Sequence, residues 1–155
     1  IKNSIKMNLL EPDTNQETVS VLPGRVKIMS FGFKYGLPNA NYYFDVSFAK
    51  NPARQKAWGM FGTIDIDMVE FVLAQKEVSN FIDLIIPVIK HIATVDSYQV
   101  VAFGCNAGRH RSPIIASEVA ARISETISTI VEHRDLPDYE AFVASLRNGK
   151  SSSKT

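Results

Sequence analysis

The sequence predicts an α/β domain in which helices pack on a mainly parallel β-sheet, in two or three layers, with an anion-binding loop between a strand and a helix. Two observations predict this class. Segments with strand patterns alternate along the chain with segments of helical periodicity. The short apolar segment 97–103, rich in β-branched residues, is typical of a buried central strand. Ligands of such sheets bind at the carboxyl ends of the strands, so the loops after the strands are the first candidates for function.

The elements of the first half follow from local patterns. Residues 25–31 alternate polar or small side chains with apolar ones, which predicts a half-buried strand. The segment 41–48 is rich in Tyr and Phe and predicts a second strand, followed by a loop. Thr63 is suited to cap the next helix, whose first turn would hold Asp65 and Asp67.

The second half continues the alternation. A helix is predicted over 78–93, with a kink or break at Pro87 because proline lacks the backbone N–H. A further strand is expected at 129–131 and a final helix at 139–146. The helix after the central strand is predicted by apolar residues that recur every four positions, namely Ile115, Val119, Ile123 and Ile127.

Length and composition allow one packed core and exclude several classes of protein. The chain has 155 residues, of which 45% are hydrophobic, and a formal net charge of +1. The small charge argues against a wholesale nucleic-acid binder but leaves room for a local basic patch. No run of roughly 18 apolar residues occurs, so we expect no membrane span. A single cysteine, Cys105, excludes an internal disulfide and favours the cytoplasm.

Three regions are expected along the chain. Residues 1–24 are polar and form a loosely structured lead-in, residues 25–147 form the domain, and the small polar residues of 148–155 form a disordered tail. The chain starts with Ile1, so the sequence leaves open whether another domain precedes it.

Three polar stretches directly follow predicted strands: 32–38, 104–112 and 132–135. Carboxyl ends of parallel strands share one edge of the sheet, so we expect these stretches to converge. In the central one, Gly104 and Gly108 free the backbone to turn, and Ser112 is suited to cap the helix that follows. The free N–H groups and dipole of a helix N-terminus favour a bound phosphate.

The same loop is rich in cationic residues. Arginine offers a rigid fork of donors that matches phosphate oxygens. His110 is the exception, because a structural hydrogen-bonding role is an alternative for it. The predicted phosphate-binding residues are Cys105, Asn106, Ala107, Gly108, Arg109, His110, Arg111 and Ser112.

An alternative comes from the spacing Cys-x-x-Gly-x-x-Arg-Ser, which is similar to that of cysteine-dependent phosphatases. Cys105 would then be the nucleophile, Arg111 the phosphoryl clamp and Ser112 its neighbour. Those enzymes usually carry histidine before the cysteine, where this chain has Gly104. They also need a general acid from another loop, for which the only candidates are Asp45, Asp65 and Asp67.

A second resemblance covers more of the chain. Five motifs occur in order: Ser30-Phe31-Gly32-Phe33-Lys34-Tyr35-Gly36-Leu37-Pro38, Tyr43-Phe44-Asp45-Val46, Asn51-Pro52, the 104–112 loop, and His133-Arg134-Asp135-Leu136. Together they resemble the C-terminal domain of the RapZ family of RNase adapters. That resemblance implies an upstream P-loop domain, presentation of small RNA to a ribonuclease, and sensing of an amino-sugar phosphate. It also implies that Lys34, Tyr35 and Gly36 make secondary or RNA contacts. His133 and Arg134, at the end of a predicted strand, are expected to extend the basic patch as further such contacts, and the alternative for Arg134 is a pair with Asp135.

The chain departs from the family pattern in several places. Asn106-Ala107-Gly108 stands where members commonly have Thr-Gly-Gly, and 58–62 matches the corresponding family segment only loosely. The basic tail of the RNA-binding members is absent, and Pro137-Asp138-Tyr139-Glu140 is acidic instead. No Gly-x-x-x-x-Gly-Lys-Ser/Thr loop occurs, so nucleotide hydrolysis by that route is not expected.

The leading hypothesis is therefore a regulatory module without catalysis of its own. It would bind a phosphorylated ligand, either a sugar phosphate or the backbone of RNA, without a metal or a cofactor. The alternatives are the cysteine-dependent phosphatase and a domain for self-association, as a homo-oligomer, within a longer protein.

Overall fold

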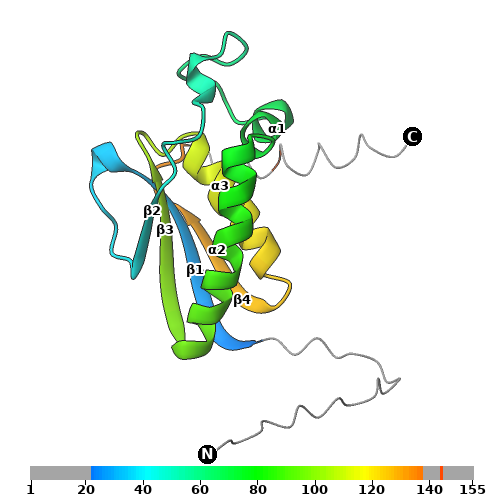
Figure 1. Ribbon diagram of the computed structural model, residues 1–155. Coiled ribbons are helices and arrows are strands. Elements are labelled where there is room, and N and C mark those ends of the chain that lie inside the picture. The colour runs from blue at the N-terminus through cyan, green and yellow to red at the C-terminus, as the bar shows by residue number, and fades with distance from the viewer. Residues whose placement is uncertain (1–21, 138–143, 145–155) are drawn as a thin grey trace, which may run out of the picture.

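A computed structural model describes residues 22–137 and residue 144 of the chain. Four parallel strands form one sheet in the order β2-β3-β1-β4 (Figure 1). The strands are β1 (Leu22–Gly32), β2 (Tyr42–Asp45), β3 (Tyr98–Cys105) and β4 (Ile127–His133). The helices are α1 (Ile66–Leu73), α2 (Lys76–Val95) and α3 (Arg111–Ile123), with short 3₁₀ turns η1 (Phe33–Tyr35) and η2 (Pro52–Arg54). The predicted α/β class with a parallel sheet is confirmed.

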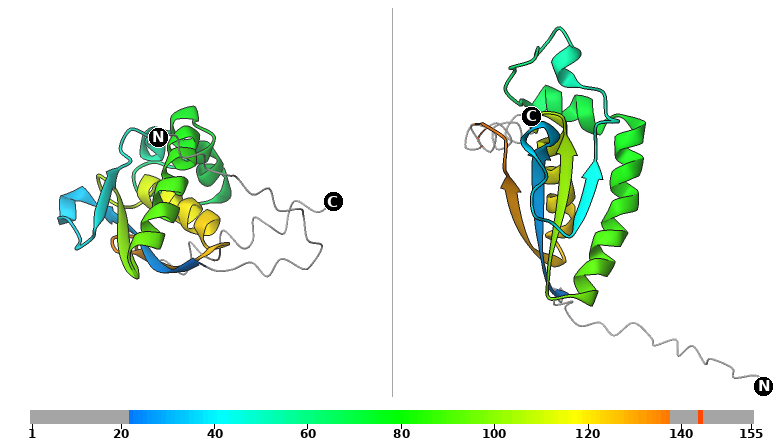
Figure 2. Two further views of the ribbon diagram at one scale, coloured as in Figure 1. Left: turned by 60° about the horizontal axis from the view of Figure 1, so that its bottom comes forward. Right: turned by 90° about the vertical axis from the view of Figure 1, so that its left-hand side faces the viewer.

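The described helices lie on one face of the sheet, so the described part of the chain has two layers (Figures 1 and 2). The alternation along β1 explains this arrangement. Val26 and Ile28 point into the large apolar core shared with α2 and α3, whereas Met29 and Phe31 belong to a small cluster on the opposite face. Most of the apolar burial therefore holds the helices against the sheet.

The strand register brings the polar stretches together. Gly32 at the end of β1 pairs with Cys105 at the end of β3, and Ser30 of β1 pairs with His133 of β4. On the other side of β3, Asp45 of β2 pairs with Gly104. The convergence predicted for the loops after β1, β3 and β4 is confirmed, and the loop after β2 joins them at the same edge.

The bounds of all four strands differ from the sequence prediction. β4 covers Ile127–His133 rather than 129–131, so Ile127, which was expected on the helix, begins this strand instead. β1 begins at Leu22, inside the segment expected to be a loose lead-in. β3 runs on through Gly104 and Cys105, because both residues continue the ladder with β1. β2 is only the four residues Tyr42–Asp45, since it pairs with β3 alone and lies at the edge of the sheet.

The cap of α1 is Asp65, not Thr63. The Asp65 carboxylate accepts a hydrogen bond of 2.8 Å from the backbone N–H of Met68, which is the usual geometry of a helix N-cap. The same carboxylate accepts from the indole N–H of Trp58 at 3.1 Å. Thr63 and Asp65 are two positions apart, and both residue types can cap a helix. Asp65 is the one that caps α1, and it also accepts the hydrogen bond from Trp58.

α2 continues through Pro87, where a kink or break was expected. Pro87 is exposed, so the carbonyl that loses its intrahelical partner faces water rather than the core. By length and composition alone, α2 is also long and apolar enough to cross a membrane. It packs one side on β1, β3 and α3, as a core helix does.

Two further predictions lie outside the described residues. The helix expected at 139–146 falls in a range of which only Ala144 is described, and the tail 148–155 is not described. The lead-in is described only from Leu22 onward.

Candidate functional site

The loop between β3 and α3 is held against the end of β1 by backbone contacts that leave no room for side chains. Gly108 has φ +69°, and a Cβ placed there would lie 2.7 Å from the backbone nitrogen of Gly32. A Cβ on Gly32 would lie 2.5 Å from the carbonyl carbon of Ala107. The two glycines therefore permit the β1 and β3 loops to cross.

Gly104 is a third position without space. A Cβ there would lie 2.5 Å from the ring of Phe31 and 2.7 Å from the ring of Phe33. The histidine that cysteine-dependent phosphatases carry at this position has no room in this fold.

Ser112 does not cap α3 as expected. The cap position is His110, whose side chain makes no capping hydrogen bond, and Ser112 lies in the first turn. The Ser112 hydroxyl donates to the carbonyl of Phe31 at 3.2 Å and lies 3.2 Å from the sulfur of Cys105. Because the hydroxyl has one proton, the thiol of Cys105 supplies the proton of the second contact. Ser112 thus links β1, β3 and α3 in the interior.

A cavity of about 310 Å³ opens beside this loop. Of the eight loop residues predicted to bind phosphate, six line it, while Gly108 and Ser112 do not. Lys34, from the turn η1 after β1, is the only lining residue among the five predicted secondary contacts. The full lining is Lys34, Asn51, Ala53, Arg54, Met60, Phe61, Cys105, Asn106, Ala107, Arg109, His110 and Arg111.

The cavity is positively charged. Lys34, Arg54, Arg109 and Arg111 line it, and no aspartate or glutamate is present among its described lining residues. Arg111 is 9% exposed, and its Nη1 donates to the carbonyls of Ser47 (2.7 Å) and Ala49 (3.2 Å). This arginine therefore fixes the segment after β2 and leaves the rest of its fork beside the cavity. Such a concentration of unpaired positive charge attracts an anion.

His110 contributes no positive charge to this cavity. Its Nε2 donates to the carbonyl of Gly62 at 2.7 Å. Burial, with the nearby charges of Arg109 and Arg111, lowers the pKa of His110 despite that hydrogen bond. Arg109 and Arg111 are the cationic residues of the loop, and His110 ties the loop to the segment before α1.

The backbone of the loop also offers donors. The N–H groups of residues 107–110 donate to no acceptor within the part of the chain that is described. They belong to the turn that leads into α3, whose dipole adds positive potential. Backbone donors and guanidinium groups at one cavity are the usual parts of a phosphate site.

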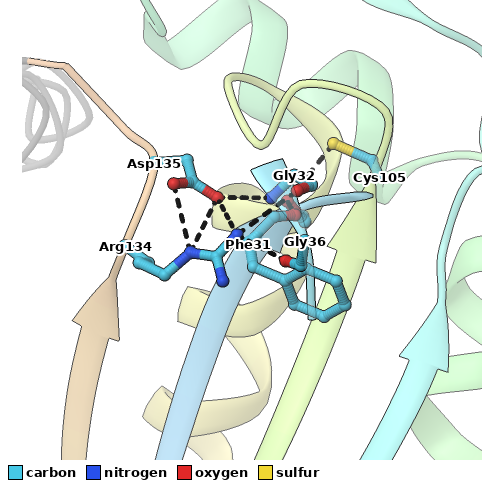
Figure 3. Close-up of polar contacts among 7 residues, drawn as sticks. Phe31, Gly32, Gly36, Cys105, Arg134 and Asp135 are labelled. Atoms are coloured by element: carbon cyan, nitrogen blue, oxygen red, sulfur yellow. Dashed lines mark hydrogen bonds and ion pairs between the residues drawn. The ribbon is translucent and has the colours of Figure 1, made fainter. Parts of the chain in front are cut away.

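The end of β4 has a different arrangement (Figure 3). Nη2 of Arg134 donates to the carbonyl of Gly36 at 2.7 Å and lies 2.8 Å from the Asp135 carboxylate. Asp135 in turn accepts from the backbone N–H of Gly32 at 2.7 Å. We call Arg134 and Asp135 the strand-end clamp, because together they hold the β1 loop that carries Lys34.

His133 and Arg134, two of the expected RNA contacts, both make hydrogen bonds within the protein. His133 Nδ1 lies 2.7 Å from the hydroxyl of Ser30, and its Nε2 lies 3.1 Å from that of Ser117. Burial lowers the pKa of His133 to about 4, so the ring is neutral at physiological pH. Neither residue lines the cavity, and the charge of Arg134 is already paired with Asp135.

Tyr35 and Gly36 do not line the cavity either. Tyr35 is exposed and lies under the Lys34 ammonium, whose Nζ is 5.0 Å from the ring centroid. Gly36 ends η1 with φ 88°.

Sequence analysis gave no site role to five lining residues: Asn51, Ala53, Arg54, Met60 and Phe61. All five belong to the loop after β2. A usable signal existed, because that loop also follows a predicted strand and begins with the Asn51-Pro52 motif. What the sequence lacked was the neighbour relation of β2 and β3, which places the loop over the cavity.

The three acids named as candidates for a general acid do not line the cavity. Asp45 accepts from the backbone N–H of Ser47. Asp65 caps α1, and Asp67 lies exposed in its first turn. Within the described residues, no group of three His, Cys, Asp or Glu side chains is placed to hold a metal ion.

Comparison with known proteins identifies the family of this chain. The RapZ C-terminal domain family matches residues 24–137. A nucleotide-binding protein of Clostridium beijerinckii is 34% identical over 120 residues, covering 73% of this chain and 41% of the relative. One from Renibacterium salmoninarum is 38% identical over 122 residues (72% and 39%), and one from Geobacillus kaustophilus is 34% identical over 117 (72% and 39%). The chain thus spans about two fifths of these relatives' length. It belongs to the RapZ C-terminal domain family.

Proposed function

We propose that this domain is a regulatory module that binds a phosphorylated ligand, a sugar phosphate or an RNA phosphate, and performs no catalysis of its own. One observation carries the proposal. A cavity of about 310 Å³ is lined by four cationic side chains, adjoins unpaired backbone N–H groups and has no carboxylate among its described lining residues. The relatives are named nucleotide-binding proteins, which agrees with a phosphorylated ligand. We place the module in the cytoplasm, where Cys105 stays reduced.

Calorimetric titration with matched pairs of compounds tests the proposal. Glucosamine 6-phosphate and glucose 6-phosphate are expected to bind, while glucosamine and glucose are not. Lys34→Ala and Arg109→Ala should each weaken binding by about 1.5–3 kcal/mol, the usual contribution of a hydrogen bond to a charged group. The ammonium of Lys34 and the guanidinium of Arg109 make no hydrogen bond or ion pair with the described residues, so both variants should keep the fold.

Arg25→Ala is the matched control, because it removes the same charge from an exposed position at the opposite end of the sheet. Equal losses for Arg25→Ala and Arg109→Ala would mean that the measured affinity reflects overall charge. In that case the cavity would not be the binding site.

The cysteine-dependent phosphatase remains a second candidate, because the Cys105 sulfur and the Ser112 hydroxyl are 3.2 Å apart, in a Cys-x5-Arg loop. Two observations speak for binding instead. No described carboxylate lines the cavity to act as general acid, and Gly104 leaves no room for the usual histidine.

Incubation with p-nitrophenyl phosphate separates the two functions. We expect no turnover that depends on the thiol, and we expect Cys105→Ser to bind sugar phosphates as the wild type does. Turnover that disappears in Cys105→Ser would make the phosphatase the function. Sedimentation of the same samples measures self-association, the third proposal for this domain.

A further inference from the structure

One wall of the cavity is the loop between β2 and α1, residues 46–65, which lies above the carboxyl edge of the sheet (Figure 1). Its lining residues are Asn51, Ala53, Arg54, Met60 and Phe61. The only regular structure in this loop is the short turn η2, so contacts of its two ends with the rest of the protein decide how firmly it is held. Two of those contacts come from consecutive residues of the 104–112 loop.

His110 and Arg111 hold the two ends of the 46–65 loop. Nη1 of Arg111 donates to the carbonyls of Ser47 at 2.7 Å and of Ala49 at 3.2 Å. Nε2 of His110 donates to the carbonyl of Gly62 at 2.7 Å. Both side chains also line the cavity, so the residues that a bound anion would meet are the residues that anchor the loop.

Arg111 is a buried charge whose described partners are carbonyl groups. Among the described residues, its Nη2 and Nε donate to no acceptor, and no carboxylate lines the cavity. Removing a charge from water costs free energy that carbonyl dipoles offset only in part. A phosphate bound at Nη2 and Nε would complete the donors of the guanidinium while Nη1 keeps both carbonyls. Anion binding therefore stabilises the position in which Arg111 holds Ser47 and Ala49.

His110 responds to an anion in the same direction. The titratable side chains that line the cavity with it are Lys34, Arg54, Cys105, Arg109 and Arg111. Burial and the charges of Arg109 and Arg111 lower the pKa of His110. A phosphate beside these arginines would offset their charge and raise that pKa again. The protonated ring would then donate to Gly62 through a charge-assisted hydrogen bond, which is stronger than a neutral one.

We infer that occupancy of the cavity is transmitted to the 46–65 loop through His110 and Arg111, because an anion strengthens both anchors and so restrains the loop. The inference rests on the proposed function and names what binding changes in the protein. The exposed side chains of the loop include Lys50, Lys56 and Phe61. The surface beside the cavity is therefore more rigid when an anion is bound than when it is not.

Hydrogen exchange with and without a saturating anion measures this restraint. The amides of Ala49, Arg54, Trp58 and Gly59 donate to carbonyls within the loop, so they exchange when the loop opens. Saturation with glucosamine 6-phosphate or inorganic phosphate should slow their exchange roughly fivefold, the factor that separates a charge-assisted hydrogen bond from a neutral one. The last turn of α2, at the opposite end of the sheet, is the internal control and should exchange as before.

Trp58 gives a second readout, because it is the single tryptophan of the sequence and lies in the loop. Its ring centroid lies 5.5 Å from that of Phe71, and the anisotropy of its fluorescence should rise on saturation. Binding measured by calorimetry with neither slower exchange nor higher anisotropy would overturn the inference and leave the proposed function intact. No binding of either compound would overturn both.

Matched variants separate transmission from binding. Lys34→Ala should weaken binding, but no described hydrogen bond joins the Lys34 side chain to the loop, so the response at saturation should remain. His110→Ala removes the anchor at Gly62, which packs against Trp58, so the response of Trp58 should be lost while that of Ala49 remains. A full response of Trp58 in His110→Ala would overturn the inference.

Proton uptake is the readout that a purely structural His110 would not give. His110→Gln keeps a neutral donor for Gly62, so it should hold the loop without a ligand-dependent gain at Trp58. Calorimetry at pH 7 in two buffers of different ionisation enthalpy should show that the wild type takes up more protons on binding glucosamine 6-phosphate than His110→Gln does. The phosphate of the probe titrates alike in both proteins, so equal uptake would overturn transmission through His110.

Discussion

The ends of β3 and β4 flank the end of β1, and each is followed by arginine. After β4, Arg134 is paired with Asp135 and donates to backbone carbonyls, while His133 is buried and neutral. After β3, Arg109 and Arg111 line a cavity in which no described acid is found. Two similar basic segments at one sheet edge therefore differ in whether a carboxylate neutralises them. A paired arginine holds the structure together, and an unpaired one is available to a ligand.

The loop after β3 and the loop after β4 both contact Gly32 at the end of β1, the first through Gly108 and the second through Asp135. We expect the largest effect of a substitution on stability at Gly108. Gly108→Ala would force φ +69° on a residue with a Cβ and place that atom 2.7 Å from the Gly32 nitrogen. We expect a loss of about 4 kcal/mol in the free energy of unfolding, from backbone strain plus overpacking. Gly59→Ala is the control, because Gly59 has φ +66° and open space around it. It should cost only about 1–2 kcal/mol in urea unfolding, and an equal cost for both would contradict the backbone contact.

The strand-end clamp is the next test. Asp135→Ala leaves Arg134 unpaired and removes the acceptor of the Gly32 N–H, so we expect a loss of about 3 kcal/mol. Asp135→Asn keeps an oxygen for Gly32 and should cost less. The side chains of the Arg122–Asp83 pair are 43% and 64% exposed, so Asp83→Ala should cost at most about 1 kcal/mol. Similar losses for Asp135→Ala and Asp83→Ala would remove the distinction between a structural and an incidental ion pair.

The neutral state of His133 predicts that the stability of the fold depends on pH. Its pKa in the folded protein is about 4, below the unfolded value of about 6.5, so the unfolded chain binds more protons between these values. The contribution of neutral His133 to the free energy of unfolding is therefore fully present above pH 6.5. It is lost as the pH drops toward 4, and the loss is roughly 2 kcal/mol at pH 5. His110, whose pKa is also lowered, adds a loss in the same direction.

Urea unfolding of the wild type and His133→Gln from pH 7.5 to 4.5 measures this dependence. The variant should lose less stability than the wild type below pH 6.5. Curves that stay parallel throughout the range would show that folding does not lower the pKa of His133.

The smallest expected effect lies between the two regions, at Ser112. Ser112→Ala removes the donor to the Phe31 carbonyl and the acceptor of the Cys105 thiol proton, which should cost about 1–2 kcal/mol. The thiol should also react faster with a disulfide reagent such as Ellman's. Ser124→Ala, which removes an exposed hydroxyl bonded to Ala121, should change neither quantity.

Local patterns were sufficient for much of the fold. The alternation in 25–31 and the apolar run 97–103 predicted the central strands. The helical stripe that begins at Ile115 predicted α3, but its last member, Ile127, begins β4. Boundaries failed where pairing decides them, as at Gly104 and Cys105, because a ladder partner is not visible in local sequence. The choice of Asp65 over Thr63 as a cap likewise coincides with a contact to Trp58 that the sequence does not show.

The candidate site was predictable in its position but not in its charge state. The 104–112 loop was found from its glycines and arginines. Arg134 and Asp135 are neighbours in the sequence, so their pairing is a local relation that the sequence offers as an alternative. The inclusion of Phe61 in the cavity is a long-range relation, because it depends on β2 lying beside β3. The lowered pKa of His110 likewise depends on its burial in the fold.

The walls of the larger cavity come from three stretches, near residue 34, across 51–61 and across 105–111, which only the folded sheet assembles. An anion held there acts as a noncovalent cross-link that the unfolded chain cannot form. At a hundredfold excess over its dissociation constant, such a compound raises the free energy of unfolding by about 2.7 kcal/mol. A melting-temperature screen of a metabolite library would therefore rank cognate compounds without any assay of downstream activity.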